Sequence, residues 1–185
     1  HSILITGGGG FIGKHTVLML LEIGYKVFVL DSFINSSKKS FSKFKRLIKL
    51  KNPDLLNNLE IFEGDIETIS SIKYLFKYAK EKKIAINSVI HFAGLKSIIE
   101  SIHYPLKYWS ANVSGTINLL NVMQENNCLN FVFSSTAGIY GNAKSSPLKE
   151  ESLIDPINPY GNTKATVEKL LEDLYSSLSK NWRIA

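Results

Sequence analysis

The chain has 185 residues, of which 44% are hydrophobic, and a formal net charge of +6. This size predicts a single domain with enough material for a layered core, and the lone cysteine, Cys128, excludes an internal disulfide and is interpreted as a small buried hydrophobe. No apolar run approaches the roughly 20 residues that span a bilayer, and the start lacks a charged leader with a secretory core, so we expect a cytoplasmic location without a membrane partner.

The first predicted element is a short apolar strand that runs into a glycine-rich turn. Residues 3–5 are apolar, residues 7–10 are consecutive glycines, and apolar residues then recur at helical spacing over 17–23. A glycine inside regular structure costs about 0.5–1 kcal/mol relative to alanine, so this run indicates a backbone that a ligand must approach closely. Strand, glycine turn and helix in this order are typical of a dinucleotide-binding fold, in which the helix N-terminus faces the pyrophosphate.

The glycines fit two registers of the dinucleotide-binding motif. Gly8, Gly10 and Gly13 satisfy G-x-G-x-x-G, and Gly7 with the last two satisfies the wider G-x-x-G-x-x-G spacing. The sequence leaves open which glycine contacts phosphate. The residues of this turn that we predict to bind the cofactor are Gly7, Gly8, Gly10, Phe11, Ile12 and Gly13.

The second predicted strand, residues 26–30, is followed by Asp31. This aspartate lies close to the ~20-residue offset from the glycine turn at which an acidic residue bonds the adenosine ribose, which favours NAD over NADP. The nearby cations of Lys38 and Lys39 leave open whether the site accepts both NAD and NADP. They begin a basic stretch, residues 38–51, whose apolar residues recur at helical spacing, so we interpret it as a solvated amphipathic helix on the sheet and not as a nucleic-acid site.

Strands and helices alternate along the rest of the chain. Further strands are predicted at residues 59–63, 88–91 and 130–134, and helices at 13–23, 69–82, 105–126 and after Tyr160. Two helices should carry apolar stripes, formed by Trp109, Val113, Ile117 and Leu120 and by Val167, Leu171, Leu174 and Leu178. Right-handed crossovers then give an α/β fold with a doubly wound parallel sheet, the three-layer αβα Rossmann fold.

Ligands of such a fold bind at the carboxyl ends of the strands, where polar motifs follow at residues 64–66, 91–96 and 134–136. Tyr160 and Lys164 come next, four residues apart and therefore on one face of a helix. An ammonium beside a phenol stabilises the phenolate, which can act as a general base.

The Tyr-x-x-x-Lys spacing also occurs at Tyr78/Lys82 and Tyr140/Lys144, so position must decide. Tyr78 belongs to a crossover helix on the flank of the sheet, and Tyr140 starts a loop. Tyr160 alone opens a helix directly after the fifth-strand loop, where Thr136 can lie opposite. We therefore predict catalysis by Tyr160 and Lys164.

In chain order, TGGGGFIG, LDS, HFAGLK, SSTAGIYG and NPYGNTK resemble the motifs of the extended short-chain dehydrogenase/reductase family over essentially the whole chain. Within it they are most similar to the isomerases that interconvert UDP-glucose and UDP-galactose. The resemblance implies tightly held NAD and reversible oxidation at sugar C4 through a 4-keto intermediate. It also implies a homodimer that acts in galactose metabolism on a UDP-sugar substrate.

The resemblance assigns a role to each matching residue. It implies that Tyr160 is the base, that Lys164 is its partner on the nicotinamide ribose, and that Thr136 bonds the sugar 4-oxygen. Substrate binding falls to Lys96, Thr136 and Tyr160. The further cofactor-binding residues that it implies are Asp31, Asn35, Ser36, Asp65, Ile66, Phe92, Ala93, Gly94, Lys96 and Asn112, together with Tyr160 and Lys164. Gly9 and Ala111 depart from the family pattern, which often has alanine or threonine at the first position and in some members asparagine at the second.

Rival interpretations stay open. A 4,6-dehydratase or decarboxylase of the family needs a carboxylate beside the active-site threonine, whereas Ala137 and Gly138 follow Thr136. A UDP-N-acetylglucosamine 4-epimerase would differ in sugar specificity, and a non-catalytic NAD-sensing module would not need the Tyr-Lys-Thr set. Because family members carry a nucleotide-sugar-binding domain after the Rossmann half, we expect residues 1–185 to be the N-terminal, NAD-binding part of a longer enzyme, with a sixth strand starting near residue 181. No metal and no nucleic acid are expected.

Overall fold

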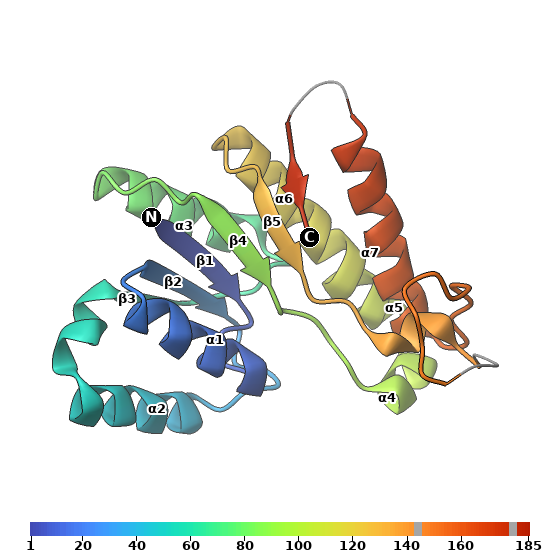
Figure 1. Ribbon diagram of the computed structural model, residues 1–185, viewed down its shortest axis with the longest axis horizontal. Coiled ribbons are helices and arrows are strands. Elements are labelled where there is room, and N and C mark those ends of the chain that lie inside the picture. The colour runs from blue at the N-terminus through green and yellow to red at the C-terminus, as the bar shows by residue number, and fades with distance from the viewer. Residues whose placement is uncertain (143–145, 178–180) are drawn as a thin grey trace.

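The computed structural model describes residues 1–142, 146–177 and 181–185, which are built around a six-stranded sheet. The strand order is β3-β2-β1-β4-β5-β6, and each neighbouring pair is parallel (Figure 1). The strands are β1 Ser2–Thr6, β2 Lys26–Asp31, β3 Leu59–Glu63, β4 Ser88–His91, β5 Asn130–Phe133 and β6 Arg183–Ile184. The order runs outward in both directions from β1 and β4, which makes their carboxyl ends the topological switch point where such sheets bind ligands.

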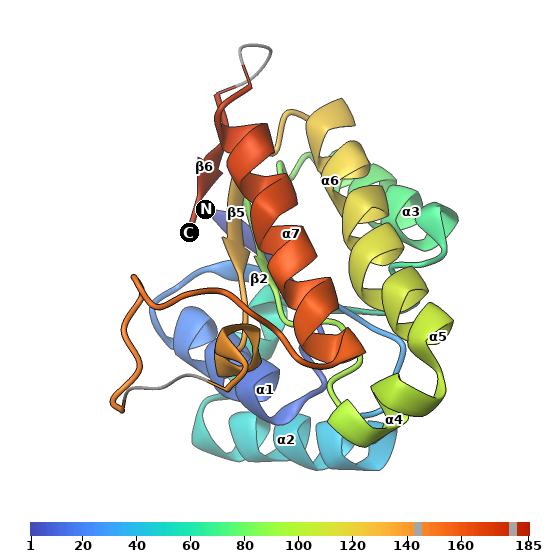
Figure 2. The ribbon, with the colours of Figure 1, turned by 90° about the vertical axis from the view of Figure 1, so that its right-hand side faces the viewer.

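Helices cover both faces of the sheet. One face carries α1 Phe11–Glu22 and α2 Lys38–Lys51, and the other carries α3 Ile69–Glu81, α6 Gly115–Glu125 and α7 Pro159–Tyr175, which lie side by side in Figure 2. The short helices α4 Ile98–His103 and α5 Pro105–Trp109 precede α6 at the ligand end of the sheet. The predicted three-layer αβα Rossmann fold, including the sixth strand, is confirmed.

Alternation along the central strands divides the core into two layers. Ile3 and Ile5 of β1 are buried with α1 and α2, whereas Leu4 between them is buried with α3, α6 and α7. Both faces of β1 are therefore apolar, as expected for a central parallel strand. Cys128 lies in the second layer, where burial raises the pKa of its thiol to about 12, consistent with a buried hydrophobe.

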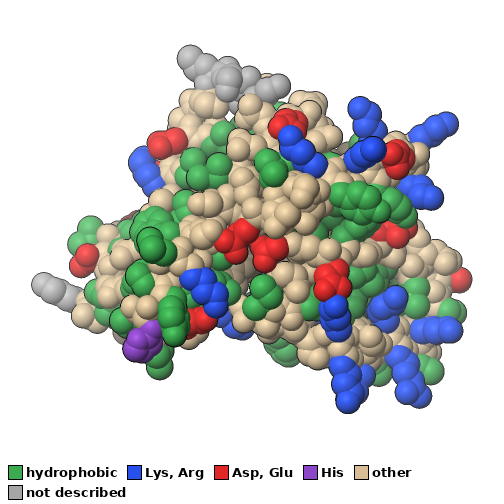
Figure 3. Space-filling model, turned by 180° about the vertical axis from the view of Figure 1, so that it is seen from behind, with side chains coloured by type: hydrophobic (Ala, Val, Ile, Leu, Met, Phe, Trp, Pro, Cys, Tyr) green, Lys and Arg blue, Asp and Glu red, His purple; other side chains and the backbone are tan. Residues whose placement is uncertain are grey.

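The basic stretch forms α2 as predicted, with Phe41 and Ile48 buried against the α1 side of the sheet. Leu47 and Leu50 differ from the expected pattern, because both are exposed. The end of the molecule that α2 occupies is rich in Lys and Arg side chains (Figure 3). In the part of the chain that the structure describes, no helix has the length and apolarity needed to cross a membrane.

The helix predicted over 105–126 is divided in the structure, and the side that it buries is not the predicted one. A π-helical turn, Ser110–Ser114, separates α5 from α6, and Trp109 and Ile117 are 36% and 39% exposed. The predicted stripe is therefore wrong at those two positions, although Leu120 is buried. Asn112 and Thr116 face inward instead because hydrogen bonds satisfy their polar groups there. In α7, Val167 and Leu171 are buried as predicted, and Leu178 lies outside the described residues.

Candidate functional site

A pocket opens at the carboxyl ends of β1, β2, β3 and β4, at the switch point of the sheet. Many of the predicted cofactor-binding residues line it, namely Gly7, Gly10, Asp31, Asn35, Ser36, Asp65, Ile66, Phe92, Ala93, Gly94 and Lys96. Leu95, Lys107 and Ala111 also line the pocket, although sequence reasoning did not assign them there. Residues from separate loops thus meet around one concave surface, as expected for a ligand site in this fold.

The glycine turn is shaped by close backbone contacts. Gly7 has a φ of +71°, and a Cβ there would lie 2.6 Å from the backbone nitrogen of Ala93. A Cβ at Gly13 would lie 2.4 Å from the carbonyl oxygen of Gly7, so α1 packs directly on the turn. Gly8 faces Val29 of β2, only 2.7 Å from where its Cβ would be. Gly7 and Gly10 line the pocket, which favours the wider glycine register.

The N-terminus of α1 fits an anion. Its cap, Gly10, has no side chain, and no acidic residue lies in the first turn. The first backbone N–H groups of a helix have no partner within the helix, and the helix dipole adds a partial positive charge there. Phe11 and Ile12 are 76% and 61% exposed, so we expect these two residues to act through their backbone N–H groups. This end of α1 suits the pyrophosphate of a dinucleotide.

Asp31 organises the loop after β2. One carboxylate oxygen accepts the backbone N–H of Gly9 at 2.7 Å, and the other accepts the N–H of Phe33 at 2.7 Å and the hydroxyl of Ser36 at 2.9 Å. A Cβ at Gly9 would lie 2.9 Å from Asp31 Oδ2, so a side chain there would require the Asp31 carboxylate to shift. The ammonium of Lys38 lies 2.6 Å from Glu63, an ion pair that reduces the charge available to a 2′-phosphate.

Asn112 lies behind the pocket wall. Its side-chain oxygen accepts the N–H of Leu95 at 2.8 Å, and its side-chain nitrogen donates to the carbonyl of Leu95 and the hydroxyl of Thr163, both at 3.0 Å. Gly94 makes this arrangement possible, because a Cβ there would lie 2.9 Å from the Asn112 oxygen. Asn112 therefore supports the Leu95 loop, and its predicted cofactor contact stays a prediction.

The start of the helix that carries Tyr160 packs on the loop that carries Thr136, beyond the end of β5. Asn158 caps α7 by accepting the N–H of Gly161 at 2.8 Å, and Tyr160 is the second residue of the helix. A Cβ at Gly161 would lie 2.8 Å from the carbonyl oxygen of Gly138, so the start of α7 packs tightly on the loop of Thr136. The Thr136 hydroxyl accepts the N–H of Gly138 at 3.2 Å.

Lys164 is buried beside the same loop. Its ammonium donates to the carbonyl of Ser134 at 2.8 Å and lies 4.4 Å from the centroid of the Phe133 ring. Burial lowers the pKa of Lys164 to about 8, and the charge of Glu168 opposes this effect. Ser135, between Ser134 and Thr136, has a buried hydroxyl without a hydrogen-bond partner in the described part of the chain, which fits a polar ligand at this point.

A buried histidine that sequence reasoning left without a role connects the strands to this region. Thr116 donates its hydroxyl proton to the carbonyl of Asn112 at 2.6 Å, so it accepts from Nε2 of His91 at 2.9 Å. Nδ1 of His91 then accepts the hydroxyl of Thr6 at 2.6 Å. Burial, with a smaller effect of the Lys164 charge, lowers the pKa of His91 to about 3, so the imidazole is neutral. Its position at the end of β4, where the HFAGLK motif begins, was the available signal.

The rival Tyr-x-x-x-Lys pairs lie away from this region or outside the described structure. Tyr78 on α3 packs edge-on to Phe62 at 5.1 Å between ring centroids, with Lys82 5.6 Å above its ring. Lys144 of the other pair is outside the described residues. Within residues 1–142, 146–177 and 181–185, no group of three His, Cys, Asp or Glu could hold a metal ion.

Comparisons with known proteins agree on the kind of protein that this chain resembles. The family model described as GDP-mannose 4,6 dehydratase matches residues 4–181. UDP-glucose 4-epimerase 2 of Arabidopsis thaliana is 42% identical over 183 residues, which cover 99% of this chain and 49% of that protein. The bifunctional UDP-glucose 4-epimerase and UDP-xylose 4-epimerase 1 of Pisum sativum is 39% identical over 184 residues, covering 100% of this chain and 50% of that protein. The chain thus spans about half the length of the curated relatives it matches.

Solved structures give the same result. The UDP-glucose-4-epimerase of Stenotrophomonas maltophila with bound NAD and formylated UDP-arabinopyranose has a TM-score of 0.85 and 34% identity, covering 99% of this chain and 51% of that one. The UDP-glucose 4-epimerase of Bifidobacterium longum in complex with NAD+ and UDP has a TM-score of 0.85 and 33% identity, covering 100% of this chain and 51% of that one.

Proposed function

Because the chain belongs to the extended short-chain dehydrogenase/reductase family, we propose that it is the NAD-binding domain of a UDP-glucose 4-epimerase. The enzyme would interconvert UDP-glucose and UDP-galactose by reversible oxidation at C4 through a 4-keto intermediate. The observation that carries the proposal is that the helix bearing Tyr160 and Lys164 packs on the loop of Thr136 at the end of β5, through Gly161 on Gly138 and through the bond from Lys164 to Ser134. Tyr160 packs against the apolar cluster of Leu95, Tyr108 and Ala111, and two members of this cluster, Leu95 and Ala111, line the pocket.

The residues around the pocket fit NAD. The glycine turn and the N-terminus of α1 would hold the pyrophosphate, and Asp31, Asn35 and Ser36 the adenosine ribose. Asp65 and Ile66 would lie by the adenine. Phe92, Ala93, Gly94 and Lys96 would line the rest of the NAD molecule. When bound, NAD supplies a hydride acceptor that returns the hydride to the sugar.

The protein side chains would move and hold the proton. The Tyr160 phenolate takes the proton from the 4-hydroxyl of the sugar and later returns it. Thr136 bonds the 4-oxygen, and Lys96 contributes to substrate binding from the pocket. Lys164, held by Ser134 at 2.8 Å, supplies positive charge between α7 and the end of β5. Positioning these groups before the reaction supplies much of the catalysis.

Several finer assignments go with this proposal. Between the two half-reactions the 4-keto sugar must turn over so that the hydride returns to its other face. We assign the space for this movement to a cleft between residues 1–185 and a nucleotide-sugar-binding domain. The homodimer and the role in galactose metabolism rest on the family resemblance, and the cytoplasmic location is the expectation from the sequence.

The matched family model is described by a dehydratase, which makes dehydration the main competing reaction. A dehydratase removes the C5 proton and expels the C6 hydroxyl, so it needs an acid and a base besides the tyrosine. Ala137 and Gly138, the residues after Thr136, carry neither.

The test is to incubate the intact protein separately with UDP-galactose and UDP-N-acetylgalactosamine and to resolve the product isomers. We expect UDP-glucose from the first substrate. Turnover of only the second would assign the protein to the N-acetylated sugars, and a 4-keto-6-deoxy product would assign it to the dehydratases. Absence of any product with stoichiometric NAD bound would favour a non-catalytic NAD-binding module.

A further inference from the structure

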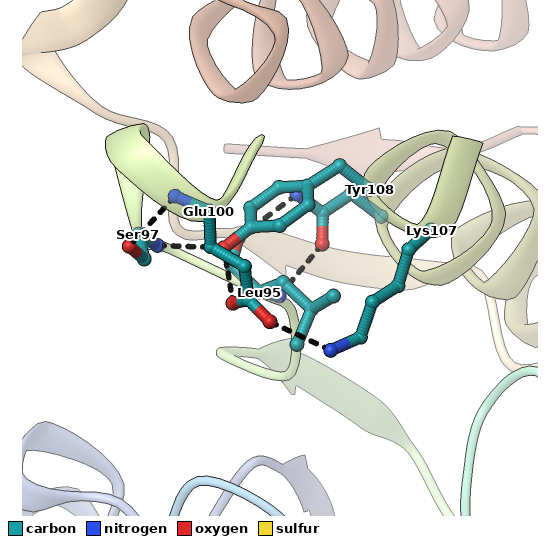
Figure 4. A network of polar contacts seen from close by, with 6 residues as sticks. Leu95, Ser97, Glu100, Lys107 and Tyr108 are labelled. Carbon is teal, nitrogen blue, oxygen red and sulfur yellow. Dashed lines mark hydrogen bonds and ion pairs between the residues drawn. The ribbon is translucent and has the colours of Figure 1, made fainter. Parts of the chain in front are cut away.

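Tyr108 of α5 is a buried tyrosine whose hydroxyl both donates and accepts a hydrogen bond. The side chain is 0% exposed. Its hydroxyl donates to a carboxylate oxygen of Glu100 at 2.9 Å and accepts the backbone N–H of Ser97 at 3.0 Å (Figure 4). The other carboxylate oxygen of Glu100 receives the ammonium of Lys107 at 2.7 Å. Burial and the Glu100 contact raise the pKa of Tyr108 to about 12, so the group remains a phenol.

The ring of Tyr108 is directed at the proposed catalytic base. The centroids of the Tyr108 and Tyr160 rings are 6.5 Å apart and their planes meet at 81°, an edge-on contact. Leu95, Tyr108 and Ala111 form an apolar cluster separate from the two main core layers, and Tyr160 packs on it. The Tyr160 ring therefore rests on a small cluster of its own.

The backbone of Tyr160 is tied to the same cluster. Its carbonyl accepts the hydroxyl of Thr163 at 2.7 Å, and that hydroxyl accepts the side-chain N–H of Asn112 at 3.0 Å. Asn112 in turn binds both backbone groups of Leu95. The Tyr160 ring and backbone are thus both connected to Leu95, Tyr108 and their hydrogen-bond partners.

We propose that Tyr108 is a positioning residue for Tyr160: Glu100 and Ser97 anchor its hydroxyl, and its ring holds the Tyr160 ring in the orientation that proton transfer to the substrate requires. The inference rests on the proposed function for the step it serves. A misplacement of about 1 Å in a reacting group can cost ~10²-fold in rate, so an anchored aromatic neighbour has a kinetic effect without touching the substrate.

The experiment compares variants of the intact protein loaded with NAD. Tyr108→Leu removes the ring, Tyr108→Phe keeps the ring and removes its anchor, and Tyr78→Leu is the control, a tyrosine packed on Phe62 away from the pocket. We expect Tyr108→Leu to lower kcat about 10-fold with KM for UDP-galactose within about 2-fold. Tyr108→Phe should recover kcat to within about 3-fold of wild type, and Tyr78→Leu should keep the wild-type kcat.

A second readout does not depend on turnover. Tyrosine labelled with ¹³C at Cζ gives one NMR signal for each ring, and the Tyr160 signal is identified by its loss in Tyr160→Phe. We expect this signal to shift and broaden in Tyr108→Leu and to stay unchanged in Tyr78→Leu. If wild type turns over no UDP-sugar, the proposed function fails, but this signal still tests the positioning of Tyr160.

Two results would overturn the positioning role of Tyr108. One is an unchanged kcat and Tyr160 signal in folded, NAD-loaded Tyr108→Leu. The other is an equal fall of kcat in Tyr78→Leu, which would indicate a general loss of stability. If Tyr108→Leu does not fold, Tyr108→Met serves instead, because it also removes the ring but fills more of the space that the ring occupies. An unchanged Tyr160 signal in that variant would also overturn the proposal.

Discussion

The ammonium nitrogen of Lys164 lies 2.8 Å from the carbonyl oxygen of Ser134, to which it donates a hydrogen bond. Ser134 directly follows β5 and begins the loop that carries Thr136, so this bond ties α7 to the end of the strand. The Lys164 side chain is only 5% exposed. The protein therefore holds a cation in a place where burial disfavours charge, which indicates a role other than stability.

Burial of Lys164 predicts a dependence of stability on pH. Its pKa falls from 10.5 to about 8 in the folded protein, so between these values the unfolded chain binds a proton that the folded chain lacks. The free energy of unfolding should then rise with pH across this interval, relative to a variant without the group. Wild type should therefore gain stability relative to Lys164→Met as the pH rises. We expect the difference, the free energy of unfolding of Lys164→Met minus that of wild type, to fall by on the order of 1 kcal/mol from pH 7 to pH 10. Urea unfolding of the intact protein measures this.

The control for this measurement is Lys169→Met, an exposed lysine on the same helix whose side chain is 69% exposed. Its difference from wild type should not fall between the same two pH values. If the difference between Lys164→Met and wild type does not change with pH either, burial of the Lys164 ammonium does not destabilise the folded protein, and the prediction is wrong.

Asp31 predicts the choice between NAD and NADP. Its carboxylate lines the pocket, and a 2′-phosphate there would meet a like charge. Asp31→Asn keeps a hydrogen-bond acceptor for Gly9 and removes the charge, so we expect the ratio of NAD to NADP affinity to fall by about 10-fold. Calorimetric titration of the cofactor-free protein checks this, with the exposed Asp54→Asn as control. An unchanged ratio would remove Asp31 from the ribose site.

Two glycines with similar φ angles allow the cost of backbone strain to be distinguished from the cost of a steric clash when each is replaced by alanine. Gly7 and Gly24 have φ of +71° and +87°, but a Cβ at Gly24 has nothing within 4 Å. Gly24→Ala should therefore cost about 1–2 kcal/mol from backbone strain alone and leave bound NAD unchanged. Gly7→Ala adds a clash with Ala93 in the pocket, so we expect a larger loss of stability together with loss of NAD. Equal behaviour of the two variants in thermal unfolding and cofactor content would contradict the close approach.

The sequence predicted the layers well because strands such as β1 are short, apolar on both faces and followed by glycine or acidic turns. It also indicated Tyr160 over two other tyrosines from its place after the fifth strand, and the family resemblance is confirmed by the comparisons. The apolar stripe over residues 109–120 was predicted wrongly at Trp109 and Ile117, because a polar pair, Asn112 of the π-helical turn and Thr116 of α6, faces inward instead.

Some features of the site leave no local pattern in the sequence. Tyr108 is recognised only from its partners Glu100, Ser97 and Tyr160, which its own position in the chain does not reveal. The bond from Lys164 to Ser134 joins residues that are 30 positions apart. Such contacts follow from how the loops after β4 and β5 meet α5 and α7, and no periodic pattern encodes that packing.

The proposed base gives a direct kinetic prediction. Tyr160→Phe keeps the ring on Leu95 and Tyr108 and removes the hydroxyl that moves the proton. We expect kcat to fall by about 10²–10⁴-fold, the usual contribution of a positioned acid or base, with NAD still bound. Tyr78→Phe should retain wild-type kcat. Wild-type activity in Tyr160→Phe would reopen the choice among the tyrosine-lysine pairs.

Epimerisation at C4 is the central claim, and the fate of the sugar hydrogens in deuterated water tests it most directly. The intact protein is incubated with UDP-galactose in deuterium oxide, and the product is analysed by NMR and mass spectrometry. Oxidation and reduction at C4 predict UDP-glucose without deuterium at C5, because Ala137 and Gly138, which follow Thr136, offer no base for that proton. Deuterium at C5 with loss of water from C6 would contradict the account and assign the protein to the dehydratases.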